Sequence, residues 1–504
     1  MWPRQTGDFG VFRVYANTQN QPATFNINNK PYKAERYFTI NTAGVKEGDY
    51  SMVYGFPYTT RQYLAASQLQ QTIDIINPIR IEARRLKLGV WDEAMRKDPS
   101  VFLKYASKQS SISNGYKKWQ GESRGLAIND VVNKKLQYEQ SLLARSHADT
   151  SSESPKSTLA QINAAVENNN TYLRAIESTN ETVLGIELIR QASVLQRIID
   201  IHRAKVSGQT LSDTLEKLKK SQDGFYKNYV PEVDKQLFTT LMPFYMMQPG
   251  IAVPNAMQQL MTANGNNFDK WSENVYSKSV LAVKGLANEY YDEPKASDTF
   301  AIKNDPAYQI YNAVVSWQKA KVQPSMSAFN KRMDMLNRRY MKHQMQYMQH
   351  DRNIYPDANQ TLRVTFGPVK GIAPQGSDNY SYISNLEDVI AKHNPTVEEF
   401  NVPAKLRDLH ARKDYGRWAT NGTVPVAFIA ANHTSGGNSG SPVLNAKGEL
   451  IGINFDRIWD GTMSDLYYDP NLCRNISVDI RYVLFIIEKY GDAGWLLNEL
   501  KLVK

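Results

Sequence analysis

A serine in a glycine-rich turn, Ser439, has the surroundings expected of a nucleophile. It lies in Thr434-Ser-Gly-Gly-Asn-Ser-Gly-Ser-Pro442, between two runs that predict strands, Val424 to Ala430 and Glu449 to Phe455. Such a turn can point the backbone N–H groups of Gly437 and Ser439 at one spot. Fixed donors of this kind stabilise the negative charge that develops on oxygen during acyl transfer. The stretch therefore predicts a nucleophilic serine with an oxyanion hole.

The flanks of this turn distinguish it from an ordinary glycine-rich hairpin loop, which is the commoner meaning of a Gly-Ser cluster. The pattern Gly-Asn-Ser-Gly-Ser-Pro is similar to the Gly-Asp-Ser-Gly-Gly-Pro nucleophile loop of chymotrypsin-like serine peptidases. A short strand follows at Pro442-Val-Leu444. Leu450-Ile-Gly-Ile453 then falls where a trypsin-like barrel has its next strand. We therefore interpret Ser439 as the nucleophile.

The composition is that of an ordinary globular chain with room for two or three domains. Of the 504 residues, 41% are hydrophobic and 22% are charged, and the net charge is +10. The basic residues are spread thinly, in pairs such as Arg84-Arg85, so a nucleic-acid partner is not expected. No apolar run has the length of a membrane span. The single cysteine, Cys473, and the lack of a spacing such as His-Glu-x-x-His predict neither a metal site nor a cofactor.

The periodicity of apolar residues changes twice along the chain. Residues 1–62 alternate in short runs that predict strands. Residues 63–358 have helical spacing, with an apolar stripe from Leu184 to Ile199. Residues 359–504 return to alternation at Thr361 to Phe366 and end in a closing helix. The order indicates an α+β chain in which a large helical domain interrupts a β domain.

Four motifs occur in order along the chain. They are Trp2-Pro-Arg-Gln-Thr-Gly-Asp-Phe9, Tyr355-Pro-Asp-Ala-Asn359, Gly436-Gly-Asn-Ser-Gly-Ser-Pro442 and Val478-Asp-Ile-Arg-Tyr-Val-Leu484. Together they make the whole chain resemble the S46 family of bacterial dipeptidyl peptidases, and in particular its Asp/Glu-specific members. The resemblance implies a chymotrypsin-like double β-barrel with an inserted α-helical cap domain. It also implies release of dipeptides from peptides with a free N-terminus, a homodimer, and a location in the periplasm or at the cell surface.

On this resemblance, residues 1–62 are the remainder of an N-terminal peptidase barrel, 63–358 the cap domain and 359–504 the C-terminal barrel. Asp8 matches the acid that orients the catalytic imidazole, although by itself it reads as a turn aspartate that caps its own backbone. The family motif has histidine where this chain has Gln5.

The catalytic histidine of the family comes from the first barrel, ahead of the acid in sequence. This chain has seven histidines, and none precedes Asp8. His433, six positions before Ser439, is expected to be a structural loop residue. We therefore expect an N-terminally truncated piece that is inactive alone, with its signal peptide in missing upstream sequence. If Met1 is instead a true start, the chain reads as a non-catalytic peptide-binding protein.

Substrate recognition is expected from two sets of residues. In trypsin-like peptidases the strand after the nucleophile loop forms a wall of the S1 pocket, and Arg457 falls at its pocket end. An arginine there can pair with a carboxylate, and the acidic-specific family members carry one, so we expect Asp or Glu at P1. The alternative is a surface arginine and a hydrophobic P1. Asp456, together with Asn114 and Trp2 on the resemblance, would hold the substrate's α-ammonium group, although Asn114 alone reads as a helix-terminal turn residue.

Overall fold

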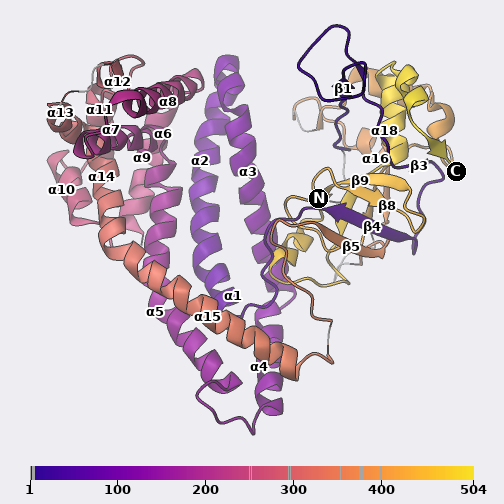
Figure 1. Cartoon of the computed structure of the whole chain (residues 1–504), viewed down its shortest axis with the longest axis horizontal. Coiled ribbons are helices and arrows are strands. Elements are labelled where there is room, and N and C mark those ends of the chain that lie inside the picture. Colours follow the sequence, from indigo (N-terminus) through magenta and orange to yellow (C-terminus); the bar gives the residue numbers. More distant parts are fainter. Residues whose placement is uncertain are drawn as a thin grey trace. The chain divides into compact units, whose positions relative to one another are not determined.

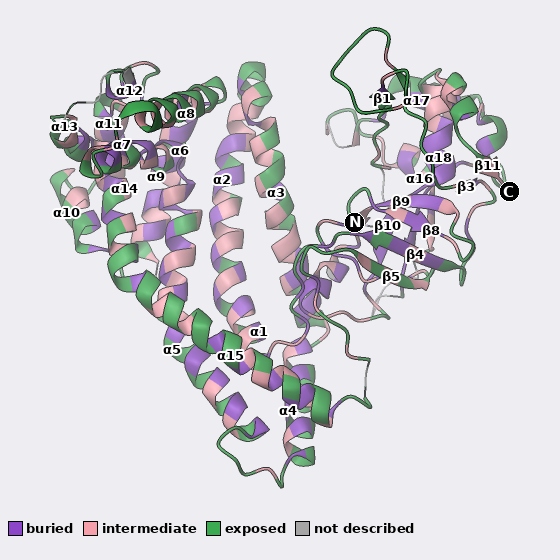
Figure 2. Cartoon of the chain, in the orientation of Figure 1, coloured by how far each residue is buried: buried purple, intermediate pink, exposed green. Residues whose placement is uncertain are grey.

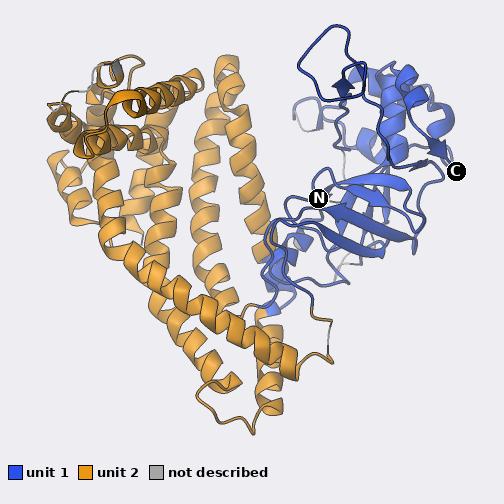
Figure 3. Cartoon of the chain, viewed as in Figure 1, with its two compact units in different colours: residues 1–63, 124–131, 355–504 blue, residues 64–123, 132–354 orange. Residues whose placement is uncertain are grey.

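A computed structural model describes residues 2, 6–248, 250, 252–292, 295, 297–351, 353–373, 380–397 and 400–504 (Figure 1). The chain forms two compact units. The first contains residues 1–63, 124–131 and 355–504, and the second contains residues 64–123 and 132–354 (Figure 3). Residues 124–131 belong to the first unit although they lie inside the helical part of the sequence. The predicted mixture of helices and strands is confirmed, and the chain is rich in helix.

The first unit is built on a curled sheet of nine strands within the described residues. Its main path runs β5-β4-β8-β9-β10-β7-β6, and all neighbours on this path are antiparallel. The strands are β3 (Ile40–Asn41), β4 (Tyr50–Gly55), β5 (Arg363–Pro368), β6 (Ile383–Asn385), β7 (Pro425–Ala430), β8 (Pro442–Leu444), β9 (Leu450–Arg457), β10 (Asn475–Asp479) and β11 (Leu502–Val503). β3 pairs in parallel with β9 and β11. A separate ribbon joins β1 (Tyr15–Ala16) to β2 (Lys30–Pro31).

The sheet has an apolar core on each face, which explains why β7 is buried at every residue. Side chains of a strand point alternately to the two faces. Phe428 packs with Val53 and Val443 in one core, and Ile429 packs in the other. The second core is covered by helices α16 (Leu386–Ala391), α17 (Ala404–Ala411) and α18 (Ile480–Phe485). This double burial fixes the register of the strands that flank the Ser439 turn.

The second unit is built from helices joined by turns and loops, and its described residues form no strand. Its helices are α1 (Ala66–Gln71), α2 (Asn77–Lys97), α3 (Pro99–Ile128), α4 (Val131–Arg145), α5 (Pro155–Glu181), α6 (Glu187–Gln191), α7 (Ser193–Arg203), α8 (Gly208–Lys227), α9 (Pro231–Met247), α10 (Asn255–Ala263), α11 (Phe268–Lys278), α12 (Glu289–Asp292), α13 (Asp298–Asn304), α14 (Pro306–Trp317) and α15 (Gln323–Tyr347). The last turns of α3 belong to the first unit. Buried residues recur every three or four positions on α5, which packs against α15 (Figure 2).

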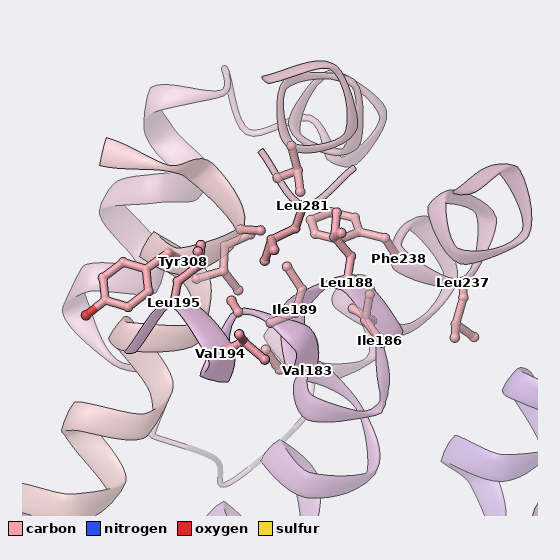
Figure 4. Packing of buried hydrophobic residues seen from close by; sticks show 14 of the residues in the cluster. Val183, Ile186, Leu188, Ile189, Val194, Leu195, Leu237, Phe238, Leu281 and Tyr308 are labelled. Carbon is pink, nitrogen blue, oxygen red and sulfur yellow. The ribbon is translucent and has the colours of Figure 1, made fainter. Parts of the chain in front are cut away.

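The largest apolar cluster of the second unit surrounds the predicted stripe from Leu184 to Ile199 (Figure 4). Leu188, Leu195 and Ile199 are buried in it, and Leu184 packs against it. The stripe lies on three short elements because the chain bends after Gly185 and at Ala192. No helix in the described ranges is both long and apolar enough to cross a membrane.

A buried aspartate ties α9 to the start of α6. The Asp234 carboxylate accepts hydrogen bonds from the N–H groups of Glu187 (2.8 Å) and Leu188 (2.9 Å) and from the Tyr276 hydroxyl (2.7 Å). The two amides are those left without helical partners at the start of α6. Burial, with a smaller contribution from Glu187, raises the pKa of Asp234 to about 6. Asp234 therefore both caps this helix and titrates above the usual range of a carboxyl group.

Candidate active site

Ser439 lies exposed in the turn that connects β7 to β8. Its hydroxyl donates a 3.3 Å hydrogen bond to the carbonyl oxygen of Phe455 on β9. Gly437 and Gly440, on either side of the Asn438-Ser439 pair, have φ angles of +96° and +85°. Residues with a Cβ rarely adopt this left-handed region, so glycine suits both positions. The glycines let the chain turn tightly enough to present Ser439 to solvent.

Buried asparagines hold this turn in place. The Asn438 side-chain oxygen accepts from the Ser435 N–H at 3.0 Å, and its carbonyl oxygen accepts from Asn454 Nδ2 at 3.0 Å. The Gly440 N–H donates to the Asn454 carbonyl at 2.7 Å. In the described part of the chain, the N–H groups of Gly437 and Ser439 have no hydrogen-bond partner. Both predicted oxyanion donors are therefore free to bind an external oxygen.

A network of neutral polar side chains continues behind the turn. Asn475 Nδ2 donates to Asn454 Oδ1 at 2.9 Å and to Ser477 Oγ at 3.1 Å. Asn432 Nδ2 donates to Asn475 Oδ1 at 3.2 Å and to Ser51 Oγ at 3.0 Å. All of these residues are buried. No periodic pattern in the sequence marks these residues, because they come from four separate strands or loops.

Arg457, at the end of β9, is tied to the segment that carries the nucleophile. Its Nη1 donates to Asp465 Oδ1 at 2.7 Å, Ser464 Oγ at 2.8 Å and the Thr434 carbonyl at 3.3 Å. Burial opposes the charge of Arg457, but the Asp465 carboxylate outweighs it, and the net pKa of the guanidinium is raised. Among the described residues every side-chain hydrogen bond of Arg457 uses Nη1, so Nε and Nη2 carry none. Asp465 was not identified from the sequence.

His433 makes two hydrogen bonds that occupy both of its ring nitrogens. Its Nε2 contacts the Ser464 carbonyl at 2.8 Å, and its Nδ1 contacts the Tyr355 hydroxyl at 3.1 Å. In the tautomer that satisfies both, Nε2–H donates and Nδ1 accepts. The ring stacks on Tyr468 with centroids 4.5 Å apart. Burial lowers the pKa of His433, so the neutral form is favoured.

The other candidates of the first unit lie in three settings. Asp8 is exposed, and no hydrogen bond or ion pair between described residues joins it to Ser439. Trp2 is buried in the helix-covered core, and its indole N–H donates to the Ser381 carbonyl at 2.8 Å. Asp456 is half-buried beside Arg457 and accepts from the Arg457 N–H at 2.7 Å. Gln5 lies outside the described residues.

Asn114 is exposed on α3 in the second unit. The guanidinium of Arg84 lies against Gly115, the residue after Asn114. A Cβ added to Gly115 would be 2.3 Å from Arg84 Nη1. Arg84 is paired with Glu181 at 3.0 Å and lies over the ring of Trp119 at 4.3 Å. These contacts hold the backbone of α3 next to Asn114. In the described residues, no group of three or more His, Cys, Asp or Glu is arranged to hold a metal ion.

Comparisons with known proteins identify the family. The family model described as peptidase S46 matches residues 1–502. The chain is 38% identical over 510 residues to an Asp/Glu-specific dipeptidyl-peptidase of Capnocytophaga gingivalis, with 100% of this chain and 70% of the relative covered. It is 35% identical over 508 residues to dipeptidyl-peptidase 7 of Phocaeicola vulgatus, with the same coverage.

The fold agrees with the sequence comparison. The crystal structure of Porphyromonas endodontalis DPP11 in complex with the dipeptide Arg-Glu matches with a TM-score of 0.87 and 33% identity. The match covers 100% of this chain and 71% of that chain. The complex of the same protein with Arg-Asp matches with a TM-score of 0.86. The chain therefore belongs to the peptidase S46 family.

Proposed function

We propose that this protein is a serine-type dipeptidyl peptidase that releases dipeptides from the free N-termini of peptides. The observation that carries the proposal is the exposed Ser439 hydroxyl beside two free backbone donors, in a chain of the peptidase S46 family. Relatives over the full length of the chain are named dipeptidyl-peptidases.

The chemistry follows from the turn. Ser439 Oγ attacks the carbonyl carbon of the second peptide bond, and the N–H groups of Gly437 and Ser439 stabilise the oxyanion. The remaining peptide leaves with its new amino group, and water then releases the dipeptide from the acyl-enzyme. In this proposal Asp8 orients the imidazole of the general base. The base itself is not assigned to any histidine of this chain. None of the seven precedes Asp8, as the resemblance requires, and His433 uses both ring nitrogens in other hydrogen bonds.

We assign the P1 preference to Arg457 and expect Asp or Glu at that position. No described residue hydrogen-bonds to the Nε–Nη2 edge of its guanidinium, and such an edge can bind both oxygens of a carboxylate. Two relatives, at 38% and 37% identity, are named Asp/Glu-specific. A hydrophobic P1 is the competing assignment, since relatives named dipeptidyl-peptidase 7 match at up to 35% identity.

We assign the α-ammonium of the substrate to Asp456. Trp2 is left out of this assignment, because its ring is buried in the helix-covered core and its indole N–H donates to the Ser381 carbonyl. Asp456 supplies a carboxylate next to Arg457, which would place the charge that attracts an N-terminus close to the S1 position. We also infer the two-barrel arrangement of chymotrypsin-like peptidases with the helical unit as an inserted cap. A homodimer and a location in the periplasm or at the cell surface complete the proposal.

The test is an assay of the intact gene product on peptides whose second residue is Asp, Glu or Leu. We expect dipeptide release from free peptides and none from the same peptides acetylated at the N-terminus. Ser439→Ala should abolish release, and a fluorophosphonate probe should add its mass to the Ser439 peptide of the parent alone. Labelling at another serine, or activity in Ser439→Ala, would contradict the assignment.

A further inference from the structure

Two residues with exposed aromatic side chains, Phe56 and Tyr58, contact the nucleophile turn, Tyr58 through its ring and Phe56 through its backbone carbonyl. They follow β4, the strand that pairs with β8, and are 58% and 60% exposed. The Tyr58 N–H donates to the Gly436 carbonyl at 2.6 Å. A Cβ added to Gly436 would be 3.2 Å from Tyr58 Cδ2, and one added to Gly437 would be 3.3 Å from Tyr58 Cδ1. The Tyr58 ring therefore packs on the backbone of both glycines, one of which carries a proposed oxyanion donor.

The segment that carries these rings is fixed on its other side by residues that precede β5. The Gln360 N–H donates to the Pro57 carbonyl at 3.0 Å, and the Thr60 N–H donates to the Ala358 carbonyl at 3.2 Å. The Thr60 hydroxyl donates to Asp357 Oδ1 at 2.7 Å. Because the backbone is held, a ligand that covers the rings pays little for ordering them. The backbone that carries the two aromatic side chains is thus preorganised.

The turn separates this aromatic surface from the proposed S1 residues. β9 contacts the turn at Ser439 through Phe455, at Gly440 through Asn454 and at Thr434 through Arg457. The Tyr58 ring contacts Gly436 and Gly437 instead, and the Phe56 carbonyl lies next to Gly437. A peptide whose scissile carbonyl binds the Gly437 and Ser439 N–H groups has its acyl half at Arg457. Its leaving half must then depart on another side of the turn.

We propose that Phe56 and Tyr58 form the S1′ subsite, which binds an aromatic or aliphatic side chain of the first residue of the leaving peptide. The inference rests on the proposed dipeptidyl peptidase function and adds a preference beyond the dipeptide. Ring-to-ring and ring-to-aliphatic contacts suit exposed aromatic side chains. No charged side chain is required for this recognition.

Binding at S1′ can be measured separately from acylation of Ser439 by letting an added amine attack the acyl-enzyme. The acyl-enzyme formed from a dipeptidyl methyl ester is attacked either by water or by an added amino acid amide. In the second case a C–N bond forms, the ester bond to Ser439 Oγ breaks, and the amine proton passes through the general base to Ser439 Oγ. The ratio of tripeptide amide to free dipeptide reports binding at S1′. It is independent of how much enzyme is active.

The experiment measures this ratio for phenylalanine amide and glycine amide with the intact gene product. We expect the parent to favour phenylalanine amide, and Tyr58→Ala and Phe56→Ala each to reduce that preference by about tenfold. Tyr50→Ala is the matched control, since Tyr50 is an exposed aromatic at the opposite end of β4. It should leave the preference unchanged.

The outcomes separate the subsite from the function. An unchanged preference in Tyr58→Ala and Phe56→Ala, or an equal loss in Tyr50→Ala, overturns the S1′ assignment. If Tyr58→Ala is inactive, Phe56→Ala decides, and inactivity of both variants would mean that the rings only support the turn. A parent that does not hydrolyse the ester at all would refute the proposed function instead.

Discussion

Replacing Arg457 tests whether this side chain selects acidic residues at P1. Arg457→Met removes the charge and keeps most of the side-chain length. Charge-assisted hydrogen bonds contribute roughly 1.5–3 kcal/mol each. Arg457→Met would lose two such bonds, from Nε and Nη2. The P1 carboxylate must also lose its hydration when it binds, so we take the net loss as about 3 kcal/mol. This loss corresponds to roughly 100-fold in kcat/KM. The Asp465 carboxylate would then repel an acidic P1 side chain and add to the loss.

The assay compares peptides that carry Glu or Gln at P1, because the two side chains differ in charge and hardly in size. We expect the Glu-to-Gln ratio of kcat/KM to fall about 100-fold in Arg457→Met, with kcat/KM for Gln changed much less. The side chains of Arg457 and Asp465 are only 12% and 10% exposed, so Arg457→Met alone leaves a buried carboxylate unpaired. The double variant Arg457→Met, Asp465→Asn restores neutrality and serves as the stability-matched control. A Glu-to-Gln ratio within twofold of the parent in both variants would refute the role of Arg457.

Three further variants test other parts of the structure. Gly437→Ala places a Cβ 2.5 Å from the Phe56 carbonyl oxygen at a φ of +96°, so kcat should fall at least 100-fold. Gly448→Ala is the control for φ alone, because Gly448 has a φ of +76° and its added Cβ would meet no atom within 4 Å. This control should retain kcat. Because the folded-state pKa of Asp234 is raised from 3.8 to about 6, its contribution makes the protein less stable as pH rises from about 4 to 6. Urea unfolding of Asp234→Asn should lack this component of up to about 3 kcal/mol, and an unchanged pH dependence would contradict the shift. His433→Phe keeps the stacking on Tyr468 but removes both hydrogen bonds of the imidazole, so Tm should fall while kcat stays within about tenfold of the parent. A fall of about 1,000-fold in kcat at unchanged Tm would instead identify His433 as the general base.

The sequence indicated the parts of this protein whose signals are local. The short apolar run Val424 to Ala430 became a buried strand. The helical stripe through Leu188 and Leu195 became part of a buried helical cluster, because its pattern repeats with the period of a helix. The Gly-Asn-Ser-Gly turn was equally visible, since its backbone angles demand glycine. These features depend on neighbours within a few residues.

Features built from distant segments could not be found in the same way. Tyr58 packs on a turn almost 400 residues away, and the partner of Arg457 is Asp465, in a stretch with no repeating pattern. Residues 124–131 likewise belong to the first unit because of their tertiary contacts, and the helical spacing of the sequence does not mark them off from the residues on either side. Asp8 stays a prediction, because its proposed role requires the imidazole of the general base. Asn114 and Asp456 stay predictions, because their proposed roles require a substrate.

The asparagine and serine network behind Ser439 has a consequence for how the enzyme responds to acidity. Its members, Asn432, Asn454, Asn475, Ser51 and Ser477, are joined by amide and hydroxyl hydrogen bonds and carry no group that titrates in the range where proteins fold. Protons gained or lost elsewhere leave the donors and acceptors of this network the same. The hydrogen bonds of this network, which hold the Ser439 turn, therefore do not change with pH. An inflection in a pH–rate profile would instead report the titration of the general base, of the substrate, or of the carboxylates that bind the substrate.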